Sequence, residues 1–124
     1  MRTRNQEYAL HIYKQVSNII NEDYCDKYGS LAHKLPVLIR TAGLAQALAF
    51  VDARGGDAGK ALLEHIAGVV GLENREKLID RSRKADLEEY MHLSRRVLAA
   101  LVWYKRFAQS VLGVEQDADV GGEL

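Results

Sequence analysis

The segment from Arg54 to Ala61 contains the residue types that bind phosphate in nucleotide-binding proteins, namely glycines followed by a lysine. In a phosphate-binding loop, glycine N–H groups surround the phosphates and the lysine reaches their outer oxygens. Here Arg54 stands where the first glycine is needed, and Ala61 replaces the hydroxyl residue that holds magnesium. A helical pattern, not a strand, precedes the segment. We therefore interpret it as a turn between two helices.

Glu89 and His92 have the Glu-x-x-His spacing by which helical bundles present a carboxylate and an imidazole to a pair of iron ions. Such a centre needs a second Glu-x-x-His pair and two further glutamates on facing helices. No other pair of this spacing occurs, and Glu64 and His65 are adjacent and therefore point to different sides of a helix. We expect neither a metal site nor a cofactor.

The nucleophiles and bases that enzymes use are scattered. The four histidines fall on different predicted helices, and no serine or cysteine has the sequence context of an activated nucleophile. An aspartate follows Cys25 directly, and a nearby negative charge raises the pKa of a thiol. We therefore expect that the chain is not an enzyme.

The segment 103–107 interleaves three aromatic residues with two cations, Lys105 and Arg106. This mixture is able to stack bases and hold phosphates of single-stranded nucleic acid. However, consecutive residues of a helix point in different directions, so part of the segment must pack in the core. Contact with nucleic acid and core packing are both open at this point, and core packing is the more ordinary interpretation.

The hydrophobic pattern predicts the elements that position these residues. Thr3 and Gln6 have the spacing of a capping box, which predicts a helix from the first residues to about Ile20. We expect a second helix over 24–43, with a turn or N-cap at 29–30 and a break near Pro36. Further helices are expected over about 44–54, 57–70 with Asp57 as its cap, 73–81 and 87–112. The sequence thus predicts an all-α, single-domain bundle of five to six helices over 1–113.

The formal net charge of zero hides an uneven distribution along the 124 residues. All 17 Lys and Arg and 13 of the 17 Asp and Glu lie in 1–112, whereas the remaining four acids lie in the last twelve residues. We expect a basic helical body and a disordered acidic tail over 114–124. A tail of this charge either points away from a bound polyanion or competes weakly with it. A single cysteine and the absence of a long apolar run predict a cytoplasmic protein with no membrane contact.

The most distinctive motif is the run over 28–46, Tyr-Gly-Ser-x-x-x-Lys-Leu-Pro-x-x-Ile-Arg-x-x-Gly-Leu-x-Gln. This run resembles the signature of the small helical subunit of the type III-B CRISPR effector, the Cmr complex. The resemblance covers residues 1 to about 112 and includes the Arg-rich start, the amphipathic first helix and the overall size. It implies a noncatalytic structural subunit, active in antiviral defense, that stacks in a few copies along the inner filament of an RNA-guided complex.

The partners that the resemblance implies are the large subunit, the backbone subunits, further copies of the chain, and the guide and target RNA. By motif position, Lys34, Arg40 and Gln46 are expected near RNA or at a subunit contact, and Gly43 is expected to form the turn before the third helix. Because guide and target pairing supplies sequence specificity, the protein need only supply positive charge and shape.

Four further cations are candidates for the same RNA or subunit contacts. Arg2 and Arg4 match the basic start of the family, whereas Arg95 and Arg96 are chosen from charge and helical periodicity. An alternative function is a stand-alone helical regulator that binds duplex DNA through a recognition helix, because the same basic body suits either nucleic acid.

Overall fold

The computed structural model describes residues 1–116 of the chain. This part contains helices and no strand, which confirms the predicted all-α fold. The six helices are α1 (Arg4–Ser17), α2 (Cys25–Ala42), α3 (Leu44–Arg54), α4 (Gly56–Val69), α5 (Arg75–Lys84) and α6 (Leu87–Ser110). None of them is long and apolar enough to cross a membrane.

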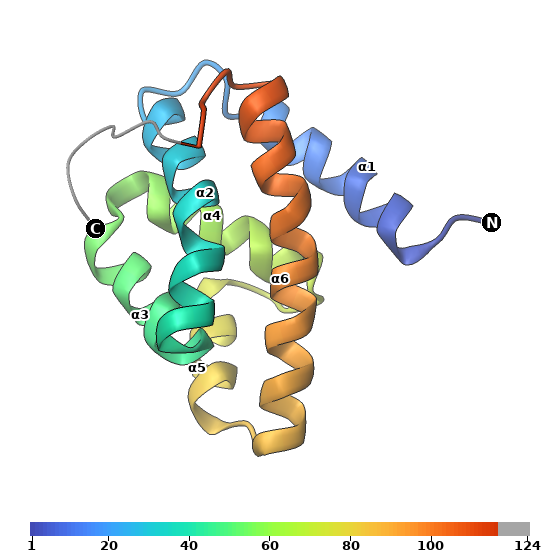
Figure 1. Ribbon diagram of the computed structural model, residues 1–124, viewed down its shortest axis with the longest axis vertical. Helices are drawn as coiled ribbons and strands as arrows, with labels where there is room; N and C mark the ends of the chain where they lie inside the picture. Colours follow the sequence, from blue (N-terminus) through green and yellow to red (C-terminus); the bar gives the residue numbers. More distant parts are fainter. Residues whose placement is uncertain (117–124) are drawn as a thin grey trace.

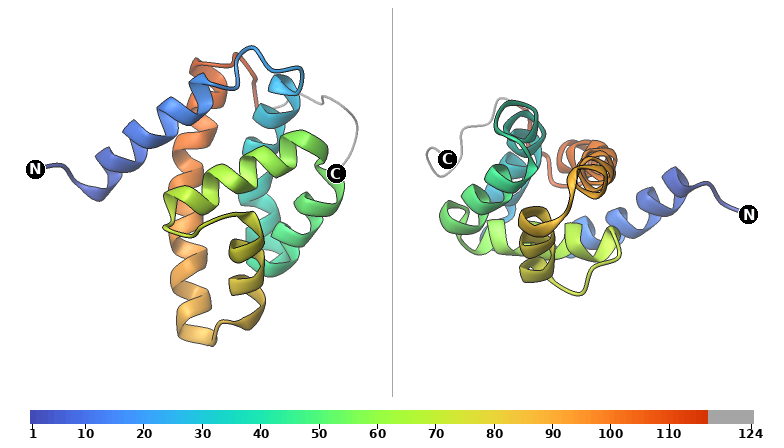
Figure 2. Two further views of the ribbon diagram at one scale, coloured as in Figure 1. Left: turned by 180° about the vertical axis from the view of Figure 1, so that it is seen from behind. Right: turned by 90° about the horizontal axis from the view of Figure 1, so that it is seen from below.

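The two longest helices, α2 and α6, lie side by side along the long axis of the molecule (Figure 1). Helix α4 crosses behind this pair, and α3 and α5 complete the second layer (Figure 2). Helix α1 packs against α6 and α4, while its N-terminal end projects from the body. One broad face of the molecule is therefore built almost entirely from α2 and α6.

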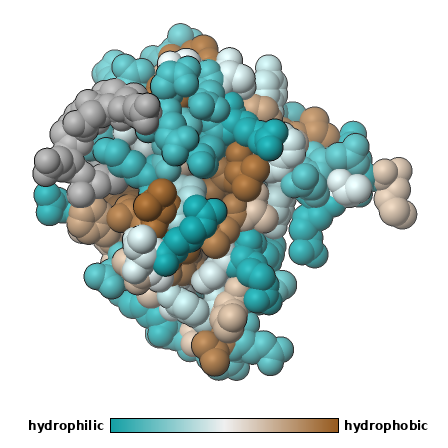
Figure 3. Space-filling view, viewed as in Figure 1, coloured by the Kyte–Doolittle hydropathy of each residue, from teal (hydrophilic) through white to brown (hydrophobic). Residues whose placement is uncertain are grey.

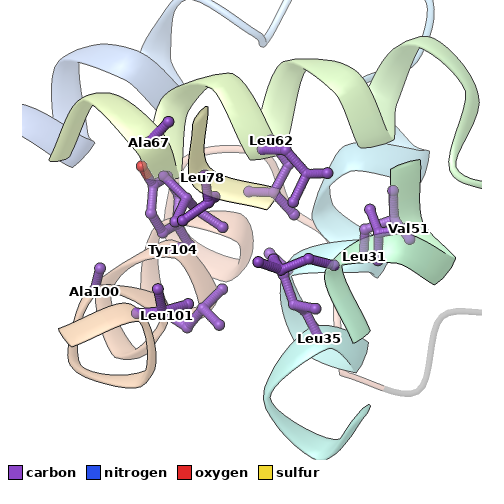
Figure 4. Packing of buried hydrophobic residues seen from close by; sticks show 14 of the residues in the cluster. Leu31, Leu35, Val51, Leu62, Ala67, Leu78, Ala100, Leu101 and Tyr104 are labelled. Carbon is purple, nitrogen blue, oxygen red and sulfur yellow. The ribbon is translucent and has the colours of Figure 1, made fainter. Parts of the chain in front are cut away.

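The hydrophobic core lies between these two layers (Figure 4). Leu31 and Leu35 of α2 meet Leu62 of α4, and Leu101 and Tyr104 of α6 close the other side. All five side chains are at most 1% exposed. Burial of a side chain of this size stabilises the fold by about 1.5 to 3 kcal/mol, so the shared core fixes α2 against α6.

Three of the six helices in residues 1–116, α1, α5 and α6, begin with a side-chain N-cap hydrogen bond. The predicted capping box is present, because Gln6 N–H donates to Thr3 Oγ1 at 3.0 Å and Thr3 N–H donates to Gln6 Oε1 at 2.8 Å. Asp57 was expected to cap the fourth helix, and this prediction is wrong. Helix α4 starts one residue earlier, its N-cap is Gly55, and Asp57 lies in its first turn. The glycine-rich segment thus lies at the α3–α4 junction.

Helix α2 corrects two further predictions. Gly29 and Ser30 form neither a turn nor a cap but lie buried inside the helix, and α2 continues without a break through Pro36. A proline inside a helix removes one backbone hydrogen bond and costs roughly 3 kcal/mol. The buried stripe of Leu31, Leu35 and Ile39 spans the proline and offsets that cost by packing against the core.

The structure also corrects the predicted boundary of the C-terminal tail. The sequence places Val114 in the disordered segment, yet this residue is only 4% exposed in the structure. Its backbone N–H donates to the carbonyl of Ala108 at 2.9 Å, and Gly113 before it adopts a φ of 73°, which reverses the chain after α6. The folded part therefore extends through Val114, and the part of the predicted tail over 117–124 lies outside the described residues.

Candidate functional site

A surface groove between α2 and α6 gathers positive charge on the broad face of the molecule. Its volume is about 440 Å³. We call it the α2–α6 groove, and its lining residues are His33, Pro36, Arg40, Leu98, Val102, Lys105, Arg106, Gln109 and Gln116. Figure 3, which views the face formed by α2 and α6, shows hydrophobic surface interrupted by hydrophilic side chains. The groove thus combines an apolar lining with cationic and amide groups.

The three cations of the groove come from two helices. Arg40 lies near the C-terminal end of α2, and Lys105 and Arg106 lie in the last two turns of α6. Within residues 1–116 none of the three forms an ion pair with a carboxylate, although the guanidinium of Arg106 lies 5.5 Å from the centre of the Trp103 ring. Their positive charge is therefore not neutralised by the folded part of the chain, and phosphate or carboxylate groups are the ligands that suit it.

The histidine of the groove is buried and holds the end of the folded chain. His33 is 3% exposed, and its Nε2 lies 2.9 Å from the backbone oxygen of Val114. Because a carbonyl oxygen only accepts, Nε2 must carry the proton and donate it. The other ring nitrogen, Nδ1, has no hydrogen-bond partner within the described residues. His33 therefore joins α2 to the segment after α6 rather than serving as an exposed base.

The aromatic residues of segment 103–107 do not line the groove. Tyr104 is fully buried, and its hydroxyl donates to Gln15 Oε1 at 2.6 Å. Trp103 stacks on Phe107 with ring centres 5.7 Å apart, and Phe107 meets the ring of Tyr13 edge to face at 5.4 Å. These rings fasten α1 to α6, as the core-packing interpretation predicts, whereas the two cations of the segment face the groove.

The sequence candidates other than Arg40 lie on other parts of the surface. Arg95 lies 7 residues before Val102 on the same side of α6, about 10 Å along the helix axis. It lines a neighbouring hollow that is rich in acids, together with Asp86, Glu88, Glu89 and His92. Arg96 points to a different side of α6, is partly buried and lies near Arg81 and Leu93.

The remaining candidates are spread over three helices. Arg4 is exposed at the first residue of α1, Arg2 is exposed just before this helix, and Gln46 is exposed on α3. Lys34 is partly buried on α2. Gly43 joins α2 to α3 with a φ of 89°, a conformation that favours glycine. The structure thus brings Arg40 together with Lys105 and Arg106, and it does not gather the other candidates at that place.

In the sequence Lys105 and Arg106 belong to the aromatic segment 103–107, and their proximity to Arg40 is not predicted from it. One local signal was available, because Leu98, Val102, Lys105 and Gln109 follow at steps of three and four and so share one face of a helix. That α2 lies beside this face depends on tertiary packing and cannot be read from either helix alone.

The residues considered for catalysis have other partners. Glu89 accepts a hydrogen bond from Arg81 at 2.9 Å, and no group of three metal-binding side chains occurs within residues 1–116. Burial, with a smaller contribution from Asp26, raises the pKa of the Cys25 thiol. Burial also lowers the pKa of His65 to about 4, and its Nδ1 is hydrogen-bonded to the hydroxyl of Tyr28 at 2.7 Å.

Comparison with known proteins identifies the family. The family model described as CRISPR-associated protein (Cas_Cmr5) matches residues 4–111. The chain belongs to this family. A Cmr5 relative from Thermus thermophilus, described as CRISPR system Cmr subunit Cmr5, is 46% identical over 112 residues, which is 90% of this chain and 98% of the relative.

A solved Cmr5 structure supports the same assignment. The crystal structure of a CRISPR-associated Cmr5 family protein from Thermus thermophilus superposes with a TM-score of 0.86 at 46% identity. The match covers 90% of this chain and 99% of the solved chain. The resemblance inferred from the motif over 28–46 is thereby confirmed. The Cmr5 family match ends at residue 111, so the acidic C-terminal residues lie beyond it.

Proposed function

We propose that this chain is a noncatalytic structural subunit of a type III-B CRISPR effector, the Cmr complex, and that its α2–α6 groove contacts guide or target RNA. Family membership supports the first part, because the Thermus thermophilus relative is itself described as a Cmr subunit. One observation carries the second part. Arg40, Lys105 and Arg106 converge on one groove, and no carboxylate of residues 1–116 neutralises them.

The chemistry of the groove suits the backbone of RNA better than its bases. Arginine and lysine donate to phosphate oxygens, and the glutamine amides at the rim, Gln109 and Gln116, donate and accept at sugar hydroxyls. Such contacts hold a strand without reading its sequence. In an RNA-guided complex the pairing of guide and target supplies the specificity, so a subunit of this kind needs no base-reading motif.

The noncatalytic role is supported by the state of the reactive side chains. The thiol of Cys25 has a raised pKa, so less of it is the reactive thiolate, and the imidazole of His65 is committed to Tyr28. Glu89 is paired with Arg81. These arrangements do not join a nucleophile, a base and an orienting group in one place.

The scattered candidates fit contacts with neighbouring subunits better than contacts with the same strand of RNA. Arg2 and Arg4 lie on the projecting end of α1, and Arg96 lies on a different side of α6 from the groove. In a stack of copies these surfaces would face other copies or the large and backbone subunits. Weak binding of RNA by each copy then becomes strong binding by the stack, because linked sites raise the effective concentration.

Isolation of the chain from its host tests this proposal. A tagged chain is purified under mild conditions, the bound proteins are identified and the bound RNA is sequenced. We expect a set of Cmr proteins together with repeat-derived guide RNA. Purification of the chain alone with duplex DNA would favour the alternative of a stand-alone DNA-binding regulator, and a comparison of duplex DNA with single-stranded RNA in a binding assay would separate the two.

A further inference from the structure

The chain leaves its folded body at a fixed place. After α6, Val114 returns to the surface of α2, where its side chain is seated against Gly29. A Cβ atom on Gly29 would lie 2.7 Å from the Val114 Cβ, so only glycine leaves room for this contact. His33 Nε2 donates to the Val114 carbonyl at 2.9 Å, across 81 residues of sequence. The contacts of Val114 with Gly29 and His33 therefore fix the position on the surface from which residues 115 onward continue.

That place is the edge of the α2–α6 groove. Gln116, the last described residue, lines the groove together with Arg40, Lys105 and Arg106. The ten residues from 115 to the C-terminus contain four acids and no Lys or Arg. The acids are Glu115, Asp117, Asp119 and Glu123. A strongly acidic segment thus starts beside three cations that lack carboxylate partners in the folded part of the chain.

The segment is also long enough to follow the groove. Eight residues, 117–124, span at most about 26 to 29 Å when extended. The groove residues of α6, from Leu98 to Gln109, extend over roughly 17 Å of helix axis. Because the segment is tethered at the groove edge, its effective concentration there is on the order of millimolar, which favours even a weak contact.

We propose that residues 117–124 dock in the α2–α6 groove of their own chain. The proposal rests on the attachment of this acidic segment at the groove edge, on its length and on its charge opposite to that of the groove. The contact consists of exposed ion pairs, each of which contributes little, so it is weak and is screened by salt. If the groove contacts RNA, a step that rests on the proposed function above, the phosphates of RNA must displace this segment. The acidic end then weakens binding of isolated RNA and is released when the chain assembles on a guide.

The docking is tested directly by comparing backbone NMR spectra of the full chain with those of a chain ending at Gln116. Truncation after Gln116 keeps Val114 and its contacts with Gly29 and His33, whereas removal from 114 onward would not. We expect the amide signals of Arg40, Lys105 and Arg106 to differ between the full chain and the truncated chain. In about 1 M salt this difference between the two spectra should disappear. Differences confined to the residues next to the truncation would overturn the docking.

A variant of unchanged length separates charge from chain removal. It carries Asp117→Asn, Asp119→Asn and Glu123→Gln and keeps Glu115, as the truncated chain does, so its amide signals at the groove should match those of the truncated chain. Docking within one chain also predicts signals that do not change on dilution. Signals that depend on concentration would show instead that the segment binds the groove of a second copy, which would contradict the proposal.

The consequence for RNA is measured with a single-stranded RNA oligonucleotide at low salt. We expect the truncated and neutralised chains to bind it about 3- to 10-fold more tightly than the full chain, and to lose this advantage in an Arg40→Ala/Lys105→Ala background. Equal affinities would overturn the competition. If neither chain binds RNA, the proposed RNA contact fails, and the NMR comparison still decides whether the segment docks.

Discussion

The hydroxyl of Tyr28 lies 2.7 Å from Nδ1 of His65 and joins α2 to α4 inside the bundle. The network continues around this pair, since Gln15 of α1 donates to the His65 carbonyl at 3.1 Å and accepts from Tyr104 of α6 at 2.6 Å. Four helices thus share one hydrogen-bonded cluster behind the face that carries the groove. The cluster links α2 to α6 through Gln15 and His65. Because the imidazole of His65 is partly buried, the stability of the fold depends on pH.

His65 predicts a loss of stability between about pH 6.5 and pH 4. Burial, followed by the nearby His11, lowers the pKa of His65 to about 4, with Glu64 acting in the opposite direction. In this pH range the imidazole of His65 is protonated in the unfolded chain but largely neutral in the folded chain. The free energy of unfolding therefore falls as the pH falls. The contribution is at most about 2 to 3 kcal/mol and is absent above pH 7.

Chemical denaturation at a series of pH values measures this effect. In the His65→Gln variant the free energy of unfolding should be lower at pH 7, because the contact with Tyr28 is weakened, and should fall less steeply toward pH 4. His92→Gln changes an exposed histidine and should keep the wild-type slope. Parallel pH profiles for wild type and His65→Gln would mean that the imidazole of His65 is not the group that titrates.

Substitution of Gly43 and of Gly68 by alanine should change the stability of the fold in opposite directions. Gly43→Ala places a side chain at a φ of 89° and brings its Cβ within 3.2 Å of the Tyr90 hydroxyl, which accepts from Ala45 N–H. We expect destabilisation by about 1 to 2 kcal/mol. Gly68 lies inside α4, where an added Cβ would meet Gln15 Nε2 at 4.0 Å, an ordinary van der Waals contact, so Gly68→Ala should stabilise the fold by up to about 1 kcal/mol. Thermal denaturation of both variants checks the opposite signs.

Trp103 contributes to the packing of α1 against α6. Its Nε1 donates to Asn5 Oδ1 at 2.9 Å and its ring stacks on Phe107, so Trp103→Ala should loosen the first turns of α1. Hydrogen exchange of α1 amides should become faster, while amides of α2 and α4 stay protected. Met91→Ala removes an exposed side chain from the same helix and serves as the control. Unchanged exchange in α1 would show that other contacts anchor this helix.

The elements predicted well from the sequence are those fixed by neighbours in the chain. Thr3 and Gln6 form their capping box within three residues, and the hydrophobic stripes set the order of the helices. The break predicted near Pro36 is absent from α2, because packing against the core outweighs the local helix-breaking preference of proline. Fold class and family could therefore be predicted, but the exact helix ends could not.

The candidate site was predicted only in part, for the same reason. The motif over 28–46 led to Arg40, but its grouping with Lys105 and Arg106 arises from the packing of α2 on α6, more than sixty residues apart in the chain. Val114 was placed in the tail because its burial requires Gly29 and His33, which lie on another helix. Contacts between distant segments are the part that the pattern of one sequence does not reveal.

The proposed RNA contact of the α2–α6 groove depends on Arg40, Lys105 and Arg106, which form no ion pair with a carboxylate of residues 1–116. The most direct measurement is the affinity of the purified chain for a single-stranded RNA oligonucleotide over a series of salt concentrations. The variant Arg40→Ala/Lys105→Ala is compared with Lys14→Ala/Lys60→Ala, which removes the same charge from exposed positions on α1 and α4.

We expect the groove variant to bind at least about tenfold more weakly than wild type, with a log–log salt slope that is shallower by roughly 1.4, because each lost phosphate contact on a single strand removes about 0.7. The control variant should stay within about twofold of wild type. Equal losses in affinity and slope for the two variants would show that net charge alone, and not the groove, explains the binding of RNA.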